Sequence, residues 1–414
     1  MKKKVLSLVL TAVLATSVLA GCGSQAAAPA AAPADGAAAD AEAPAAEAEA
    51  VNVADFKVGV IYIGDENEGY TAAHMQGADE MAAALGLSAD QVLEKTLIPE
   101  DQSCYDAAVD LAESGCDLII GTSFGHEDYL IQAAKEFPEI TFCHATGYQA
   151  ASTGLPNMHN FFDNIYEARY VAGIAAGMKL NAMLEAGEIT EPKIGYIGAY
   201  PYAEVVSGYT SFFLGARSVC PDATMEVMYT NSWADMALEK ETAESLIADG
   251  CVFISQHADT TGAPSACQAS KVPCVGYNVS MLAVAPDYAL TSASNNWGIY
   301  YTYAAQCVLE GKPFETDWSK GYAEGAVYCT ELGSACVEGT EEAMNDAIAK
   351  ISAGELHVFD TTTFTVGGKS IEDLIAEGGD FEKYGAYVSD GYFHESELAS
   401  APSFDLRIDG IVEK

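Results

Sequence analysis

The residues best suited to bind a ligand are concentrated in short loops that follow apolar segments. In the first half of the chain these loops are Gly64–His74, after Ile63, and Gly121–Asp128, after Ile120. The second half contains four similar loops, at 199–204, 231–235, 256–259 and 277–280. Each loop combines an aromatic or imidazole ring with an amide, a carboxylate or a hydroxyl group. The loops therefore predict a cleft that binds a flat, polar, heteroaromatic ligand.

Motifs typical of enzymes are missing from the sequence. It contains no Gly-x-Ser-x-Gly elbow, Walker loop, His-Glu-x-x-His pair or dinucleotide glycine fingerprint. His257 and Asp259 could pair as a base and its orienting acid, but no nucleophile stands at a recognisable spacing. No Cys-x-x-Cys pair or Cys/His cluster indicates zinc. We therefore predict a protein that is not an enzyme and has no catalytic residue, cofactor or metal site.

The elements that position these loops are arranged in two copies of one plan. Gly115 and Gly250, each between a helical segment and a strand, are 135 positions apart, and so are Pro138 and Pro273. A third pair of segments agrees at an offset of 136. In each copy, short apolar strands alternate with helices, expected at 71–85, 103–115 and 127–137, and then at 205–219, 237–249 and 262–270.

This alternation predicts the α/β class, with two doubly wound parallel-sheet lobes joined by a hinge. Such sheets bind ligands beyond the carboxyl ends of their strands, where the polar loops lie. The chain is expected to cross between the lobes near 158–162, 290–294 and 313–325, with the helix at 297–310 returning to the first lobe. The expected domains are 55–160 plus 293–315 (first lobe), 161–292 plus 316–340 (second lobe) and 341–414 (an extension near the hinge and second lobe). The partly alternating segment 357–366 could form a strand or a hairpin.

The chain begins with a segment typical of exported proteins. Basic residues, an apolar stretch and small residues predict a signal peptide at 1–21. Its end, Ser-Val-Leu-Ala-Gly-Cys, resembles a bacterial lipobox in which Cys22 is lipidated; an ordinary signal peptide with an incidental cysteine is the alternative. The acidic, Ala- and Pro-rich segment 22–54 predicts a disordered tether. We expect a lipid-anchored protein on the extracytoplasmic face of the cell membrane.

The net charge disfavours several classes of partner. The chain carries 60 acidic and 19 basic residues, for a formal charge of −41. Such a charge opposes binding to nucleic acid, to anionic lipid and to multiply phosphorylated ligands. Ten cysteines follow Cys22, and several lie in apolar runs where Val or Ala would serve. We interpret most of them as free, buried thiols.

Several longer motifs together resemble one known family, over residues 56 to about 335. The motifs include Gly69-Tyr70-Thr71-Ala72-Ala73-His74, Thr122-Ser123-Phe124-Gly125, Asn231-x-Trp233-x-Asp235, Gln256-His257-x-Asp259 and Asn296-Trp297-Gly298. They resemble the basic membrane lipoprotein family of substrate-binding proteins of ABC importers, and a subgroup associated with purine bases most of all. The resemblance implies the type I periplasmic-binding fold, a purine base or nucleoside as ligand and an ABC permease as partner. A lipid-anchored nucleoside or sugar hydrolase and a sensory receptor for the same ligands are the alternatives.

The resemblance also implies roles for individual residues. Tyr70 and Trp233 would stack on the two faces of the base, from opposite lobes. Phe124 and Gly125 would line the first-lobe wall, and His74 is a further candidate. The second lobe would supply hydrogen-bonding groups from Glu204, His257, Asp259 and Asn278.

One departure from the family concerns Asn278. The family often has Gly-x-Asp-x-Asp here, whereas this chain has Gly276-Tyr277-Asn278-Val279-Ser280. Asn278 would face the sugar side of the site without a carboxylate for ribose hydroxyls, which favours a free base.

Several residues near these loops also have a structural interpretation. His74 lies one helical turn after Tyr70 and could simply pack there. Asp235 suits the N-cap of the following helix, and His126 and Glu127 suit a solvated first helical turn. Arg169 is expected to pair with a carboxylate between elements rather than with the ligand.

Overall fold

The computed structural model describes residues 51–414. The expected signal peptide, the lipidation site Cys22 and the tether up to residue 50 lie outside the described residues, so these assignments stay predictions. Among residues 51–414, no helix is both long enough and apolar enough to cross a bilayer.

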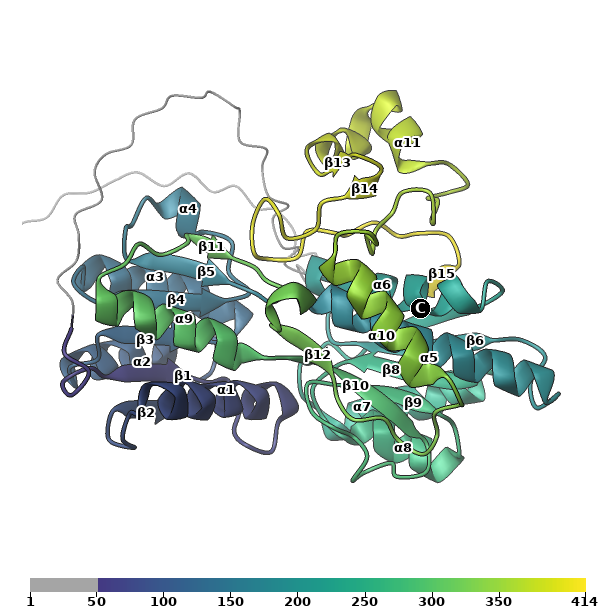
Figure 1. Ribbon diagram of the computed structural model, residues 1–414, viewed down its shortest axis with the longest axis horizontal. Coiled ribbons are helices and arrows are strands. Elements are labelled where there is room, and N and C mark those ends of the chain that lie inside the picture. Colours follow the sequence, from purple (N-terminus) through teal and green to yellow (C-terminus); the bar gives the residue numbers. More distant parts are fainter. Residues whose placement is uncertain (1–50) are drawn as a thin grey trace, which may run out of the picture. The chain divides into compact units, whose positions relative to one another are not determined.

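The first lobe is built on a six-stranded sheet in which all strands are parallel. Alternate residues of a strand face opposite sides of the sheet. Val58 and Val60 accordingly join one apolar cluster with helices α1 and α9, whereas Ile61 joins another with α2 and α3. The sheet order is β11-β5-β4-β3-β1-β2, with β1 Val58–Ile61, β2 Val92–Lys95, β3 Leu118–Gly121, β4 Thr141–Ala145, β5 Met158–Phe161 and β11 Asp317–Trp318. Its helices are α1 Gly69–Leu85, α2 Gln102–Glu113, η1 Phe124–His126, α3 Glu127–Glu136, α4 Ala150–Thr153 and α9 Trp297–Glu310 (Figure 1).

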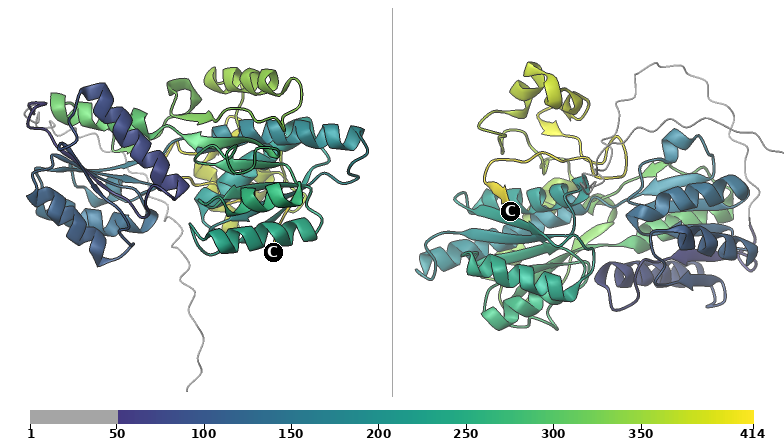
Figure 2. Two further views of the ribbon diagram at one scale, coloured as in Figure 1. Left: turned by 90° about the horizontal axis from the view of Figure 1, so that it is seen from below. Right: turned by 180° about the vertical axis from the view of Figure 1, so that it is seen from behind.

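The second lobe repeats the plan on a seven-stranded sheet. Helices α5 and α6 pack closely because glycines lie where they meet: a Cβ atom at Gly215 would collide with the Tyr170 carbonyl oxygen. The sheet order is β12-β10-β9-β8-β6-β7-β15, and only β12 runs antiparallel to its neighbour. The strands are β6 Lys193–Gly198, β7 Thr224–Tyr229, β8 Phe253–His257, β9 Cys274–Tyr277, β10 Ala289–Asn295, β12 Val327–Cys329 and β15 Ile411–Glu413. The helices are α5 Ile165–Glu185, α6 Ala203–Val219, α7 Met236–Ala248, α8 Gly262–Ser270 and the short η2 Tyr322–Glu324 (Figure 2).

The predicted fold class is confirmed. Each of the six expected helices is present, and its ends differ from the expectation by two residues or fewer. The strands between them form parallel sheets, as their short apolar pattern predicts. The expectation of a strand or hairpin at 357–366 is wrong: the segment forms turns, with only isolated bridges at Asp360 and Val366.

Three segments connect the lobes and form the hinge. They follow β5, separate β10 from α9, and join β11 to β12. Backbone hydrogen bonds tie them together: Asn164 N–H donates to the Lys320 carbonyl at 2.8 Å, and Asn296 N–H donates to the Ala326 carbonyl at 2.7 Å.

Residues 293–295, expected in the first lobe, instead complete β10 in the second sheet. A larger difference concerns residues 316–340, which the expectation assigned to the second lobe. Asp317 and Trp318 instead pair with β5 in the first sheet. The reason is the buried Trp318 indole, which packs 5.0 Å from the Tyr300 ring in the first-lobe core. Helix α9 packs against α1 in the same lobe.

The residues after 340 lie against the second lobe. Helix α10 (Thr340–Ser352) packs on α5, and β15 extends the second sheet beyond β7. Glu413 secures this last strand, because its carboxylate accepts hydrogen bonds from the Tyr209 and Tyr229 hydroxyls, both at 2.6 Å. The remaining elements are α11 Ile371–Glu377, η3 Gly379–Ala386, β13 Val388–Ser389 and β14 Tyr392–Phe393.

The ten cysteines of residues 51–414 are free thiols, and eight of them are buried. Burial raises the pKa of Cys143 to about 12, so its thiolate form is suppressed. We predict that denatured protein carrying Cys22→Ser titrates ten thiols without reductant, whereas native protein titrates about two, the partly exposed Cys329 and Cys336. The measurement is a colorimetric thiol assay with and without guanidinium. Three or more disulfides in anaerobically purified protein would contradict it.

Candidate ligand-binding site

A hollow of about 320 Å³ lies between the lobes, at the carboxyl ends of their strands. Six of the nine ligand-contact candidates from the sequence line it: Tyr70, Phe124, Glu204, Trp233, His257 and Asp259. His74, Gly125 and Asn278 are not among its lining residues. Reasoning from the sequence missed Glu68 and Tyr277, which do line it. Glu68 directly precedes helix α1, and its place in the polar loop between β1 and α1 could have pointed to it.

Tyr70 is held rigidly at the start of α1. Glu68 is the N-cap, and its carboxylate accepts the Tyr70 N–H at 2.6 Å and the Thr71 N–H at 2.9 Å. The Tyr70 hydroxyl donates to the Thr122 carbonyl at 2.6 Å, which fixes the ring. The Gly69 N–H donates to the Asp259 carbonyl at 3.0 Å, so the same turn is joined to the second lobe.

Trp233 lies in the loop after β7, in a cluster of rings from the second lobe. Its indole is 5.2 Å from the Tyr200 ring and 6.1 Å from the Tyr202 ring. Tyr202 also stacks across the interface on Phe124 of the first lobe, at 5.6 Å. Aromatic side chains from both lobes therefore line or border the hollow, and Tyr70 and Trp233 approach it from opposite lobes.

The polar side of the hollow is acidic. Burial raises the pKa of Glu204 to about 7. Burial, together with the neighbouring carboxylates of Glu68, Glu239 and Glu204, raises the pKa of Asp259 well above its ordinary range. Burial, and then the charge of Arg169, lowers the pKa of His257 well below its usual value, so this imidazole is neutral.

These groups are oriented by hydrogen bonds. His257 Nε2 lies 3.2 Å from Glu204 Oε1, and Asn278 Nδ2 donates to Asp259 Oδ1 at 2.7 Å. The hollow thus presents carboxyl and imidazole groups to a ligand, and no Lys or Arg is among its lining residues. Such a lining favours ligands that carry N–H or O–H donors and no negative charge.

The three remaining candidates make contacts outside the hollow. His74 is fully buried, stacks on Trp297 at 4.1 Å and places Nδ1 2.8 Å from the Tyr301 hydroxyl. The Gly125 N–H donates to Glu100 Oε1 at 2.8 Å. Asn278, 1% exposed, supports Asp259 and adopts a φ of +64°, a conformation that Asn tolerates better than most residues.

Asp235, His126 and Glu127 were each expected to have a structural role at the start of a helix. Asp235 caps α7 as expected, accepting the Ala237 and Leu238 N–H groups at 3.0 and 2.9 Å. The expected solvated helical turn at His126 and Glu127 is wrong: both residues are buried. Glu127 is drawn inside because its carboxylate accepts the backbone N–H groups of the loop after β4, at Tyr148 and Gln149, each at 2.8 Å.

The expectation for Arg169 is also wrong. Its guanidinium donates to the Tyr196 hydroxyl at 2.6 Å and the Gln256 carbonyl at 3.0 Å, and lies 3.9 Å from the centre of the Tyr277 ring. It has no hydrogen bond or ion pair with a carboxylate in the part of the chain that the structure describes. Arg169 lies on the buried face of α5, where the acceptors within its reach are the neutral Tyr196 hydroxyl and the Gln256 carbonyl.

The raised pKa of Glu204 predicts a pH-dependent stability. An acid whose pKa is higher in the folded state binds protons more tightly there, so its contribution to stability is fully present below about pH 4.5 and is lost as the pH rises to about 7. We expect Glu204→Gln to remove this decrease, a difference of up to about 3 kcal/mol between pH 5 and 8. Urea unfolding at both pH values measures it, with the exposed Glu113→Gln as control. Parallel pH dependences in wild type and Glu204→Gln would contradict the prediction.

The chain is similar in sequence to several known proteins. Residues 56–362 match the family model described as ABC transporter substrate-binding protein, PnrA-like. A purine-binding protein of Brucella abortus is 35% identical over 305 residues, covering 73% of this chain and 83% of the relative. A putative ABC transporter glucose-binding protein of Haloferax volcanii is 33% identical, covering 65% of each chain.

Solved structures show the same fold. An ABC transporter solute-binding protein from Conexibacter woesei superposes with a TM-score of 0.61, at 20% sequence identity. The match covers 73% of this chain and 98% of that structure.

Proposed function

Because the chain belongs to the family of PnrA-like ABC transporter substrate-binding proteins, we propose that its ligand is a purine base or a purine nucleoside. Members of this family deliver solutes to ABC importers outside the cytoplasm, which implies a permease as partner. The alternatives of a hydrolase and of a sensory receptor are not better supported by the family or by the relatives of the chain.

The observation that carries the proposal is the pairing of aromatic and acidic groups in the interlobe hollow. Tyr70 and Trp233 come from opposite lobes, and each can offer a ring face to a flat base. Stacking of a base on an aromatic side chain contributes about 1–3 kcal/mol. Asp259 and Glu204 supply oxygen atoms for the ring N–H and amino groups of a purine. The acidic lining disfavours a nucleoside phosphate.

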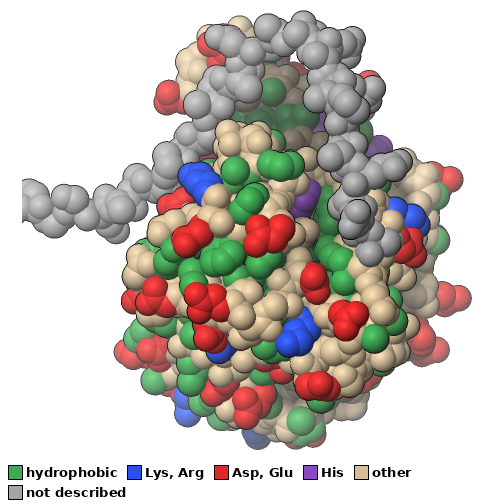
Figure 3. Space-filling view, turned by 90° about the vertical axis from the view of Figure 1, so that its left-hand side faces the viewer, with side chains coloured by type: hydrophobic (Ala, Val, Ile, Leu, Met, Phe, Trp, Pro, Cys, Tyr) green, Lys and Arg blue, Asp and Glu red, His purple; other side chains and the backbone are tan. Residues whose placement is uncertain are grey.

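The surface charge supports the same choice of ligand. Acidic side chains are spread over the face in Figure 3, with few basic ones among them, as the composition of 60 acidic and 19 basic residues requires. A phosphorylated ligand would approach against this field, whereas a neutral base or nucleoside would not. The same field disfavours nucleic acid as a partner.

Ligand binding would stabilise the closed arrangement of the lobes. The Gly69 N–H to Asp259 carbonyl bond and the stacking of Phe124 on Tyr202 already join the two sides of the hollow. A base between Tyr70 and Trp233 would add contacts to both lobes, and opening the hinge would remove half of them. The ligand therefore shifts the open–closed equilibrium through its differential affinity.

We further propose that the protein is anchored to the membrane through a lipid on Cys22. This rests on the lipobox-like sequence before Cys22 and on the leader that precedes it. Intact-mass measurement of the membrane-extracted protein tests the proposal, since Cys22→Ser should abolish the lipid adduct.

Replacing Trp233 tests the ligand. We expect Trp233→Ala to weaken binding of adenine, guanine and their nucleosides by roughly 5- to 150-fold, because one stacking face is lost. Trp318→Phe, in the first-lobe core, is the control and should keep its affinity. Isothermal titration calorimetry measures both, with adenosine monophosphate and glucose as further ligands. Glucose binding without purine binding would overturn the proposal, and conversion of a nucleoside to free base would show an enzyme.

Replacing Asn278 tests its position. In the structure Asn278 donates to Asp259, so Asn278→Asp would set two carboxylates against each other. We expect affinities for base and nucleoside to fall together, by about tenfold or more. Asn278→Gly, which removes the donor and tolerates the positive φ, should have the smaller effect. Stronger nucleoside binding with unchanged base binding would instead place Asn278 beside the ribose.

A further inference from the structure

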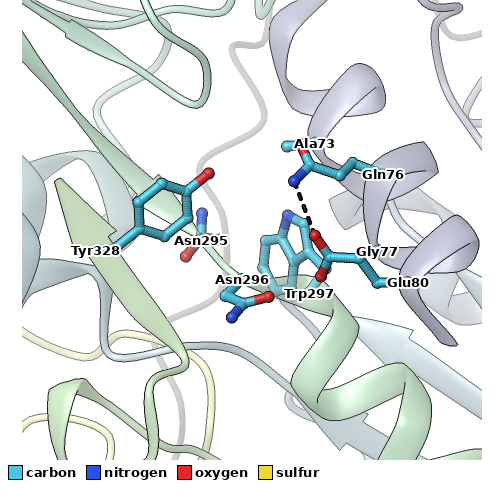
Figure 4. Close-up of a pocket in the computed structure, with 8 residues that line it drawn as sticks. All are labelled: Ala73, Gln76, Gly77, Glu80, Asn295, Asn296, Trp297 and Tyr328. Atoms are coloured by element: carbon cyan, nitrogen blue, oxygen red, sulfur yellow. Dashed lines mark hydrogen bonds between the residues drawn. The ribbon is translucent and has the colours of Figure 1, made fainter. Parts of the chain in front are cut away.

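A second hollow, of about 310 Å³, lies at the hinge. Its walls come from both lobes: Gln76 and Glu80 from α1, Trp297 from the start of α9, Asn295 from the end of β10 and Tyr328 from β12 (Figure 4). None of these residues lines the interlobe hollow. It is therefore a separate space on the hinge.

Buried polar atoms without hydrogen-bond partners line this hollow and indicate that it could bind a ligand. The Asn295 side chain is 3% exposed, and neither its oxygen nor its nitrogen has a hydrogen-bond partner within residues 51–414. The indole Nε1 of Trp297, which is 1% exposed, is also unpaired there. In Figure 4 the Asn295 amide lies between the Tyr328 ring and the side chains of α1. A buried amide left unpaired costs about 1–3 kcal/mol, which a ligand with matching groups would recover.

The lining defines the chemistry of such a ligand. The Asn295 carboxamide presents an N–H donor and a carbonyl acceptor side by side. It can therefore pair with a flat group that also carries one acceptor and one donor side by side, such as another carboxamide, a lactam or an aminopurine. The Glu80 carboxylate accepts from Gln76 Nε2 at 2.8 Å and has further acceptor capacity. No Lys or Arg lines the hollow, so no positive charge in the lining would offset the repulsion between Glu80 and a negatively charged ligand.

We propose that this hinge hollow is a second binding site, for a small, flat, uncharged molecule that carries a carboxamide or lactam group. Asn295 pairs with the amide edge of the ligand, Trp297 supplies the indole N–H, and Glu80 selects against anions. The site goes beyond the proposed purine receptor and does not require it.

Contacts through Trp297 connect the two hollows. The Trp297 indole stacks on the His74 ring at 4.1 Å and 11°. The Tyr70 ring stands edge-on to both, at 4.4 Å from His74 and 6.0 Å from Trp297, and also lines the interlobe hollow. Because the hinge hollow has walls from both lobes, a ligand there has a different affinity for each hinge angle. Occupancy of one site should therefore change the affinity of the other, and this coupling rests on the proposed ligand.

Nicotinamide and nicotinate form a matched pair of probes, since they differ in a carboxamide and a carboxylate on the same ring. The chain has three tryptophans, so Trp233→Phe with Trp318→Phe leaves Trp297 as the only indole reporter. We expect nicotinamide to change this fluorescence in the presence of saturating adenine, and nicotinate to bind at least tenfold more weakly. A crystal soaked with nicotinamide should show it against Asn295.

Two variants test the residues of the site. Asn295→Leu should weaken nicotinamide binding at least tenfold, with thermal melting as the check that the variant is folded. The exposed Glu80→Lys should shift the preference from nicotinamide toward nicotinate. Competition between nicotinamide and adenine for one site, or no nicotinamide binding to the wild type, would overturn the inference. Nicotinamide binding that depends on Asn295 in a protein that binds no purine would support the second site and refute the proposed function instead.

Discussion

Asp259 is the residue on which the geometry between the lobes depends. Its carbonyl accepts the Gly69 N–H from the first lobe, and its N–H donates to the Trp233 carbonyl. Its carboxylate accepts the Asn278 amide. One residue in the loop after β8 thus connects the first turn of α1, the loop that carries Trp233 and the loop after β9. Three of the rings that line the hollow depend on this connection: Asp259 bonds to the backbone of Trp233 itself, and to the neighbours of Tyr70 and Tyr277 in the chain, Gly69 and Asn278.

Asp259 also belongs to a group of buried carboxyl groups whose negative charge is costly. Asp259 is buried near Glu68, Glu204 and Glu239, and burial raises the pKa of each of these carboxyl groups. Arg169 is close enough to lower the pKa of Glu204, but its guanidinium is engaged by Tyr196 and Gln256. Charge removed from water in this way must be compensated by protons or by donors. A ligand rich in N–H groups would supply such donors, so the acidity of the site agrees with the proposed ligand.

The fold was largely readable from the sequence because its signals are local. Apolar strands alternating with helices specify a doubly wound sheet, and the offset of 135 between Gly115 and Gly250 reveals the second copy. Helix ends were found within two residues because glycines, prolines and capping groups mark them. The strand at Asp317–Trp318 was assigned to the wrong lobe, since a two-residue strand carries no periodic signal and its place is decided by where the Trp318 indole is buried.

The sequence by itself determined that rings and polar groups would gather at the strand ends, because the carboxyl ends of parallel strands share one edge of a sheet. Only the tertiary structure decided which of them face the space between the lobes. His74 and Asn278 stand in the expected loops but turn inward, to Trp297 and Tyr301 and to Asp259. Glu127, a plain first-turn acid in the sequence, is buried by backbone donors from a loop about twenty residues later. Contacts between segments distant in the chain make these choices, and no local pattern encodes them.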